Sequence, residues 1–213
     1  MRLIPWWALL SAACAPLVLI LGWVVVGMLS GPSYDPATQT ISSLEAQDVP
    51  GHWLVVAALA GLGTCHLVTA LGLRAASRAG RLALAGGGVA SILVALFQEP
   101  QHGGSLRHGV TVGVGFALLC VWPGLTVDHR RGAPWALRPG PAALVIVLML
   151  LGALWFVIAL NHHGAAGVAE RLVTTVQSCW PLIVVLSCPH HAGPGPRTGP
   201  QVHPRTRRRP AGR

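Results

Sequence analysis

The sequence predicts an all-α polytopic membrane protein: a bundle of six transmembrane helices with both termini in the cytoplasm. Hydrophobic residues make up 53% of its 213 residues and charged residues only 10%, whereas an average soluble domain has about 25% charged residues. The apolar residues also gather into six long runs, and about 20 apolar residues suffice to cross a bilayer. This composition excludes an ordinary soluble domain. It also excludes a disordered chain, which needs low hydrophobicity and high charge.

The six apolar runs are the predicted spans of a transmembrane domain over residues 1–188. They cover about residues 6–29, 53–73, 82–97, 109–127, 142–160 and 169–188. The first run is longer than the apolar core of a signal peptide, so we expect a retained helix.

Glycines in two of the runs predict close helix packing. The third run is short for a span and contains Gly86, Gly87 and Gly88. Glycines allow close backbone contact between helices in a membrane. Gly109 and Gly113 in the fourth run form a GxxxG pattern that we interpret in the same way.

The distribution of arginine predicts the topology. The net charge is +9, and the fifteen basic residues are all arginine. With the N-terminus inside, all of them except Arg107 and Arg171 lie on the cytoplasmic side, as the positive-inside rule requires. Because the arginines are spread between apolar runs, they do not indicate nucleic-acid binding. The Ala-, Gly-, Pro- and Arg-rich composition favours a bacterial protein, and hence the bacterial plasma membrane.

The C-terminal segment, residues 189–213, is predicted to be a disordered basic cytoplasmic tail, because it is rich in Pro, Gly and Arg and lacks apolar residues. Its arginine cluster, which includes Arg205 and Arg207, is suited to contact with anionic lipid headgroups. The expected partner is therefore the lipid bilayer, and the oligomeric state is left open.

The polar residues that carry candidate chemistry collect on the outer side of this topology. The candidate polar cluster, functional or structural, consists of Asp35, Ser42, Ser43, His108, Glu170 and Arg171. Other polar residues expected on that side include Glu45, Glu99, His102, His162 and His163. Ionisable groups at or within a bilayer are costly and mark functional sites.

Several local contacts are expected around this cluster. Ser42 with Glu45 three residues later fits a capping box, which predicts a short helix starting at Ser42. Glu170 is placed in the first turn of the sixth helix, where the helix dipole favours a carboxylate. We expect Arg171 to pair with Asp35 or Glu45 and so to hold the segment Tyr34–Leu44 on the bundle.

The sixth helix is predicted to carry a polar face. Glu170, Thr174, Gln177, Ser178 and Pro181 recur at intervals of three and four, so they share one side of a helix. Such a face should point into the bundle or into a water-filled cavity.

One further histidine lies within a predicted span. His66 is in the second run, and we expect it to be neutral and bonded to a backbone carbonyl or to Thr69.

Three sequence segments carry a family resemblance. The first is Tyr34-Asp35-Pro36, followed by Gln39-Thr40-Ile41-Ser42-Ser43-Leu44. The second is the single residue His108, after the third span. The third is Gly167-Val168-Ala169-Glu170-Arg171-Leu172 before the sixth span, with Trp180 further along. With these motifs the chain resembles the bacterial and archaeal membrane family known as domain of unknown function 998. The resemblance covers roughly residues 10–188 and implies six helices but no established activity. The chain differs from the family pattern at Gln98-Glu99-Pro100-Gln101.

The function hypotheses follow from the polar cluster. We favour a non-enzymatic binding or interaction role with an outward-facing polar vestibule. One alternative is a membrane-embedded enzyme, metal-assisted through His and carboxylate ligands, that acts on lipid or envelope substrates. A second alternative is a small transporter. Because the sequence has no metal-binding motif and no G-x-S-x-G elbow, no catalytic residue, metal ligand or cofactor is assigned.

Overall fold

The protein is a bundle of six α-helices. The computed structural model describes residues 4–100, 104–162 and 164–188, and within these ranges it contains no strand. The elements in chain order are α1 (Trp6–Leu29), η1 (Ser42–Glu45), α2 (His52–Gly72), α3 (Arg78–Leu96), α4 (Leu106–Leu125), η2 (Trp135–Leu137), α5 (Pro139–Asn161) and α6 (Ala166–Ser187), where η denotes a short 3-10 helix.

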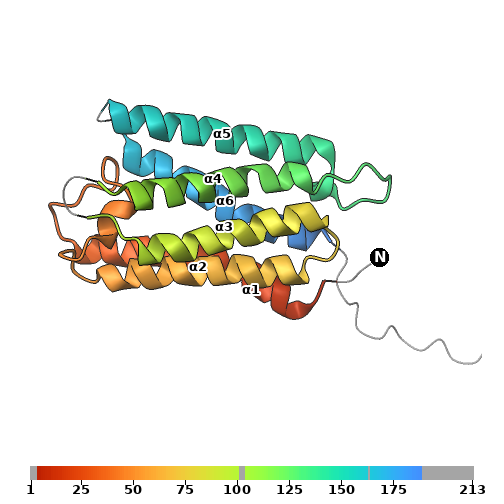
Figure 1. Cartoon of the computed structure of the whole chain (residues 1–213), viewed down its shortest axis with the longest axis horizontal. Coiled ribbons are helices and arrows are strands. Elements are labelled where there is room, and N and C mark those ends of the chain that lie inside the picture. The colour runs from red at the N-terminus through yellow and green to blue at the C-terminus, as the bar shows by residue number, and fades with distance from the viewer. Residues whose placement is uncertain (1–3, 101–103, 163, 189–213) are drawn as a thin grey trace, which may run out of the picture.

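Helices that follow one another in the chain run in opposite directions (Figure 1). Each helix packs against the next one in the chain, and α6 also packs against α1, so the last helix completes the bundle. The α4–α5 seam is the least extensive of these contacts. Because the number of helices is even, α1 begins and α6 ends at the same end of the bundle (Figure 1).

The outer surface of the bundle is apolar. Leucines of α5 such as Leu144, Leu148 and Leu151 are about half exposed, although they are large and hydrophobic. An exposed apolar surface of this extent marks contact with lipid. Five helices, α1 to α5, are long and apolar enough to cross a membrane. The predicted all-α, six-helix fold is confirmed, and it is consistent with a helical membrane bundle.

Local capping sets where the helices start. The third helix starts at Arg78, before the apolar run predicted at 82–97, because the Ser77 side chain accepts a hydrogen bond from the backbone N–H of Gly80 at 3.0 Å. Arg81 then reaches back to α2, where its Nε donates to the carbonyl of Ala70 at 2.6 Å. The third helix is therefore longer than the sequence suggested.

Glycine allows α2 and α3 to cross closely. A Cβ atom at Gly63 would collide with the carbonyl oxygen of Gly88, and one at Gly88 would collide with the carbonyl of Gly63. The prediction that the third run packs closely is confirmed at this crossing. The same interpretation is wrong for Gly109 and Gly113, since no atom lies within 4 Å of a Cβ built at either position.

Some predicted features lie outside the described residues. These are His102, His163 and the tail 189–213, with its expected contact to anionic lipid.

Candidate functional site

The segment between α1 and α2 folds onto the start of α6. Gly167 makes this possible, because a Cβ atom there would collide with the carbonyl oxygens of Pro36 and Gln39. The backbone N–H of Val168 donates to the carbonyl of Ala37 at 3.2 Å. Two segments far apart in the sequence thus meet through backbone contacts.

Arg171 holds this segment in place. Its Nη1 donates to the carbonyl oxygens of Pro36, at 2.9 Å, and Gln39, at 3.0 Å, and its Nη2 donates to the Tyr34 hydroxyl. The guanidinium also lies over the ring of Trp23, 5.1 Å from its centroid, a favourable cation–π arrangement. Burial raises the pKa of Tyr34, with Arg171 acting in the opposite direction.

The predicted partner of Arg171 is wrong. Asp35 is exposed and instead closes its own turn, because its carboxylate accepts from the backbone N–H of Ala37 at 3.0 Å and from the Thr38 hydroxyl at 2.8 Å. These hydrogen bonds lower the pKa of Asp35. Arg171 does not pair with Glu45 either, and instead donates to several backbone carbonyl oxygens that its planar guanidinium reaches at once. The Tyr34–Leu44 segment does lie on the bundle as expected, but Asp35 does not join the other candidate residues.

The short helix η1 is present, but its predicted cap is wrong. The cap of η1 is Ile41, and no side chain of the cap residue bonds to the helix. The backbone N–H of Ser43 donates to the Thr40 hydroxyl at 3.1 Å, and the Ser43 hydroxyl donates to the Thr40 carbonyl at 2.7 Å. Thr40 and Ser43 therefore satisfy the turn, and the Ser42 hydroxyl is left to bond elsewhere.

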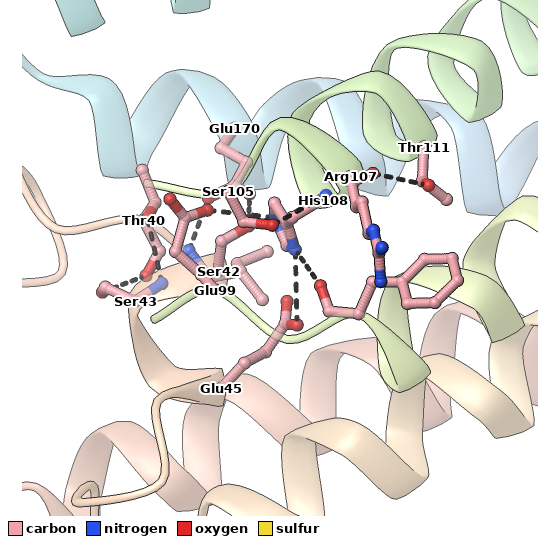
Figure 2. A network of polar contacts seen from close by, with 12 residues as sticks. Thr40, Ser42, Ser43, Glu45, Glu99, Ser105, Arg107, His108, Thr111 and Glu170 are labelled. Carbon is pink, nitrogen blue, oxygen red and sulfur yellow. Dashed lines mark hydrogen bonds and ion pairs between the residues drawn. The ribbon is translucent and has the colours of Figure 1, made fainter. Parts of the chain in front are cut away.

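Ser42, Glu170 and His108 converge at this end of the bundle (Figure 2). The Ser42 hydroxyl donates to Glu170 Oε1 at 3.3 Å, and His108 Nε2 lies 3.2 Å from the same hydroxyl. The other carboxylate oxygen of Glu170 accepts from the backbone N–H of Ile41. Glu170 is not in the first turn of its helix as predicted, because α6 begins at Ala166. Hydrogen bonds from η1, rather than the helix end, therefore satisfy its carboxylate.

The start of α4 positions His108. Gly104 adopts a φ of 66°, which glycine reaches without strain, and Ser105 then caps α4 by accepting from the His108 backbone N–H at 3.3 Å. His108 Nδ1 donates to the carbonyl of Phe97 at 2.9 Å, while Nε2 lies 3.1 Å from Glu99 Oε2. The Ser42 hydroxyl has a single hydrogen, so it donates either to Glu170 Oε1 or to an unprotonated Nε2 of His108, but not to both at once. A protonated Nε2 instead donates to Ser42 Oγ or to Glu99.

Glu45 and Glu99 belong to the site but were not among the predicted cluster residues. Glu45 is only 1% exposed, and its Oε2 lies 4.0 Å from His108 Nδ1, which is beyond hydrogen-bond distance. Burial, together with the nearby carboxylates of Glu170 and Glu99, raises the pKa of Glu45 to about 9. The sequence indicated Glu45 as a capping residue and as a possible partner of Arg171, and both predictions are wrong.

The polar cluster lies at the mouth of two hollows. One is a groove between α4 and α5, with a volume of about 440 Å³. Its polar lining residues are Thr40, Ser42, Glu99, His108 and Glu170, and its apolar lining residues are Gly109, Val112, Gly113, Phe116, Ala153, Phe156, Val157 and Leu160. The other is a smaller cavity, and Ser42, Val112, Phe116 and Glu170 line both hollows.

The polar face of α6 points into the bundle, as predicted. Glu170, Gln177, Ser178 and Pro181 are buried, and the Gln177 side chain donates to the carbonyl of Phe116 on α4 at 3.3 Å. The expected bond of His66 to a backbone carbonyl or to Thr69 is wrong, because neither ring nitrogen has a hydrogen-bond partner in the described residues. The Thr69 hydroxyl donates to Ser11 on α1 at 3.2 Å.

Family comparison agrees with the motifs. The model of a family of proteins of unknown function, DUF998, matches residues 12–187. The chain belongs to this family. No curated protein and no solved structure matches it. In this DUF998 protein the two most specific parts of the resemblance, residues 35–44 and 170–172, meet through Glu170 and Arg171. The position where the chain differs from the family pattern supplies Glu99 to the site.

A metal centre has no support in the described part of the chain. Within residues 4–100, 104–162 and 164–188, no group of three or more His, Cys, Asp or Glu side chains is arranged to hold a metal ion.

Proposed function

We propose that this membrane protein is a non-enzymatic binding protein whose ligand is a single-chain amphiphile in the groove between α4 and α5. The observation that carries the proposal is the composition of that groove, which is apolar along its length and polar at one end. A lipid molecule has the same division between chain and headgroup. We further propose that the polar end faces outward from the bacterial plasma membrane, since the arginine-rich loops lie at the other end.

The shape of the groove suits an acyl chain. Gly109 and Gly113 leave the α4 side open, since no atom lies within 4 Å of a Cβ at either position. Phe116 and Phe156 stack across the seam with ring centroids 6.3 Å apart and close the far end from the polar cluster. Val157 and Leu160 on α5 are about half exposed, so the groove opens sideways toward lipid.

The polar end favours a headgroup that donates hydrogen bonds. Its lining contains the carboxylates of Glu99 and Glu170, the His108 imidazole and two hydroxyls. Neither Arg107 nor Arg171 lines the groove, and Arg171 already donates to backbone carbonyls. Like charges repel strongly where water is scarce. An amine or hydroxyl headgroup is therefore favoured over a phosphate or carboxylate.

Binding of defined amphiphiles in lipid nanodiscs tests this function. We expect octadecylamine and monoolein to bind and to raise the unfolding temperature, and stearic acid and phosphatidic acid to bind much more weakly. Gly113→Leu should fill the groove and lower the affinity about tenfold or more, equivalent to about 1.4 kcal/mol. Gly140→Leu is the matched control, because Gly140 also has open space around it but does not line the groove.

Two results would contradict the proposal. One is equal binding of all four amphiphiles, which would remove the role of the carboxylates. The other is an equal loss of affinity in both leucine variants, which would place the ligand elsewhere.

A second candidate function is acyl-ester hydrolysis at Ser42. The supporting observation is the 3.2 Å distance between Ser42 Oγ and His108 Nε2, with Nδ1 oriented by the Phe97 carbonyl. His108 would take the Ser42 proton as Oγ attacks the ester carbonyl, and would then return it to the leaving alcohol. Water would hydrolyse the acyl-serine. Labelling of Ser42 by a long-chain fluorophosphonate, absent in Ser42→Ala, would favour this candidate over simple binding.

A further inference from the structure

The second hollow is a smaller cavity below the polar cluster, and its largely apolar lining includes several polar groups. Glu45 and Glu170 line its outer end, Gln177 and Ser178 of α6 line its side, and His66 of α2 also lines it. All five of these residues are buried. A pocket lined this way inside an otherwise apolar bundle needs a physical explanation.

Two of these groups lack partners in the described part of the chain. His66 is 1% exposed, and neither of its ring nitrogens has a hydrogen-bond partner there. Glu45 Oε2 is also buried and unpartnered. Buried polar groups in native proteins are almost always hydrogen-bonded to protein or to ordered water. Since both groups line one cavity, a common ligand in that cavity can satisfy both.

The size of the cavity matches water. It has about 70 Å³ of space for the centres of water molecules, and one water needs only about 10–15 Å³ by this measure. Hydroxyl and amide groups along α6 supply the two to four polar partners that an ordered water requires. Beyond His66, large side chains such as Leu73, Trp122 and Met149 are fully buried and pack together in the core. The cavity therefore ends near His66 instead of crossing the bundle.

We propose that this cavity is a dead-end hydrated arm, through which water and protons pass between the polar cluster and His66. The titratable side chains that line the arm are Glu45, Glu170 and His66. Each can pass a proton to a neighbouring water, so His66 exchanges protons with the outer solution although it lies within a membrane-spanning helix. The proposal does not depend on the amphiphile, since it concerns the cavity and not the groove.

Water-to-imidazole magnetisation transfer tests the arm. The full chain is labelled with ¹⁵N-histidine and reconstituted in nanodiscs without added ligand, and His66→Gln assigns the resonance. We expect rapid transfer from water to the His66 ring, comparable to that at His129, which is exposed. Ser178→Leu fills the cavity and should reduce transfer to His66 at least tenfold without changing His129. If that variant does not fold, Ser91→Leu fills the same cavity from α3.

Three results would overturn the proposal. Absence of transfer to His66 in the unmodified protein would mean a dry cavity. Unchanged transfer in a folded cavity-filling variant would mean that water reaches His66 by another route. Proton leakage through the protein in liposomes with a pH gradient, measured with an internal pH dye, would mean that the arm is not a dead end. Failure of amphiphile binding alone would leave all three measurements unaffected.

Discussion

Arg171→Gln should release the Tyr34–Leu44 segment from the bundle while the helices stay packed. The side chain makes three hydrogen bonds to that segment, to the carbonyls of Pro36 and Gln39 and to the Tyr34 hydroxyl. A hydrogen bond from a charged group contributes about 1.5 kcal/mol or more. Loss of the three bonds should therefore cost about 4.5 kcal/mol, on the order of a thousandfold in the docking equilibrium.

Amide hydrogen exchange of Ile41 measures this docking directly. Its N–H donates to the buried Glu170 carboxylate, so exchange requires the segment to detach. We expect Arg171→Gln to speed exchange at Ile41 by up to about a thousandfold, while amides in the middle of α2 stay protected. Arg171→Lys should show a smaller effect, because an ammonium cannot reach all three acceptors. Unchanged protection of Ile41 in Arg171→Gln would refute this account of the segment.

Three other predictions concern Gly167, Asp35 and Glu45. Gly167→Ala should also speed exchange at Ile41, since its Cβ would displace the Pro36 and Gln39 carbonyls, whereas Gly109→Ala should have no effect on that amide. Arg171→Glu combined with Asp35→Arg should not recover thermal stability, because Asp35 is bonded within its own turn; recovery would restore the ion pair rejected above. Glu45 has a folded-state pKa of about 9, above its ordinary 4.5, so its stabilising effect is complete below about pH 4.5 and is lost as the pH rises to 9. Between these pH values the unfolding free energy should fall less steeply in Glu45→Gln, by up to about 1.4 kcal/mol per pH unit. Denaturant titration at several pH values measures this slope. Parallel curves of unfolding free energy against pH for the two proteins would contradict the argument that Glu45 is buried.

The sequence predicted the helices well because their signal is local. The continuous apolar run from Trp6 to Leu29 contains all that is needed to identify α1. The polar face of α6 was also predictable, since the interval of three and four residues from Glu170 to Ser178 repeats the helical period.

The geometry of the site was harder to predict because it depends on backbone groups. Arg171 bonds to carbonyl oxygens, which every residue possesses and which leave no trace in the sequence. Glu99 reaches His108 across the α3–α4 connection, where the chain differs from the family pattern. The open space beside Gly109 and Gly113 depends on how far α5 lies from α4, and no residue in α4 encodes that distance.

The polarity of α6 has a consequence for biosynthesis. Among the helices in the part of the chain that the structure describes, α1 to α5 alone are apolar enough to be recognised as spans by length and composition. Helix α6 carries Glu170, Arg171 and Gln177 on the side that ends up buried. A helix with such a composition gains little from entering hydrocarbon alone. It must enter the bilayer together with α1 and α5, the helices against which it packs most extensively. In nascent chains arrested before α6, the surfaces of α1 and α5 that pack against α6 should therefore be exposed to chaperones and proteases. Packing of α6 against α1 is then the last step of assembly.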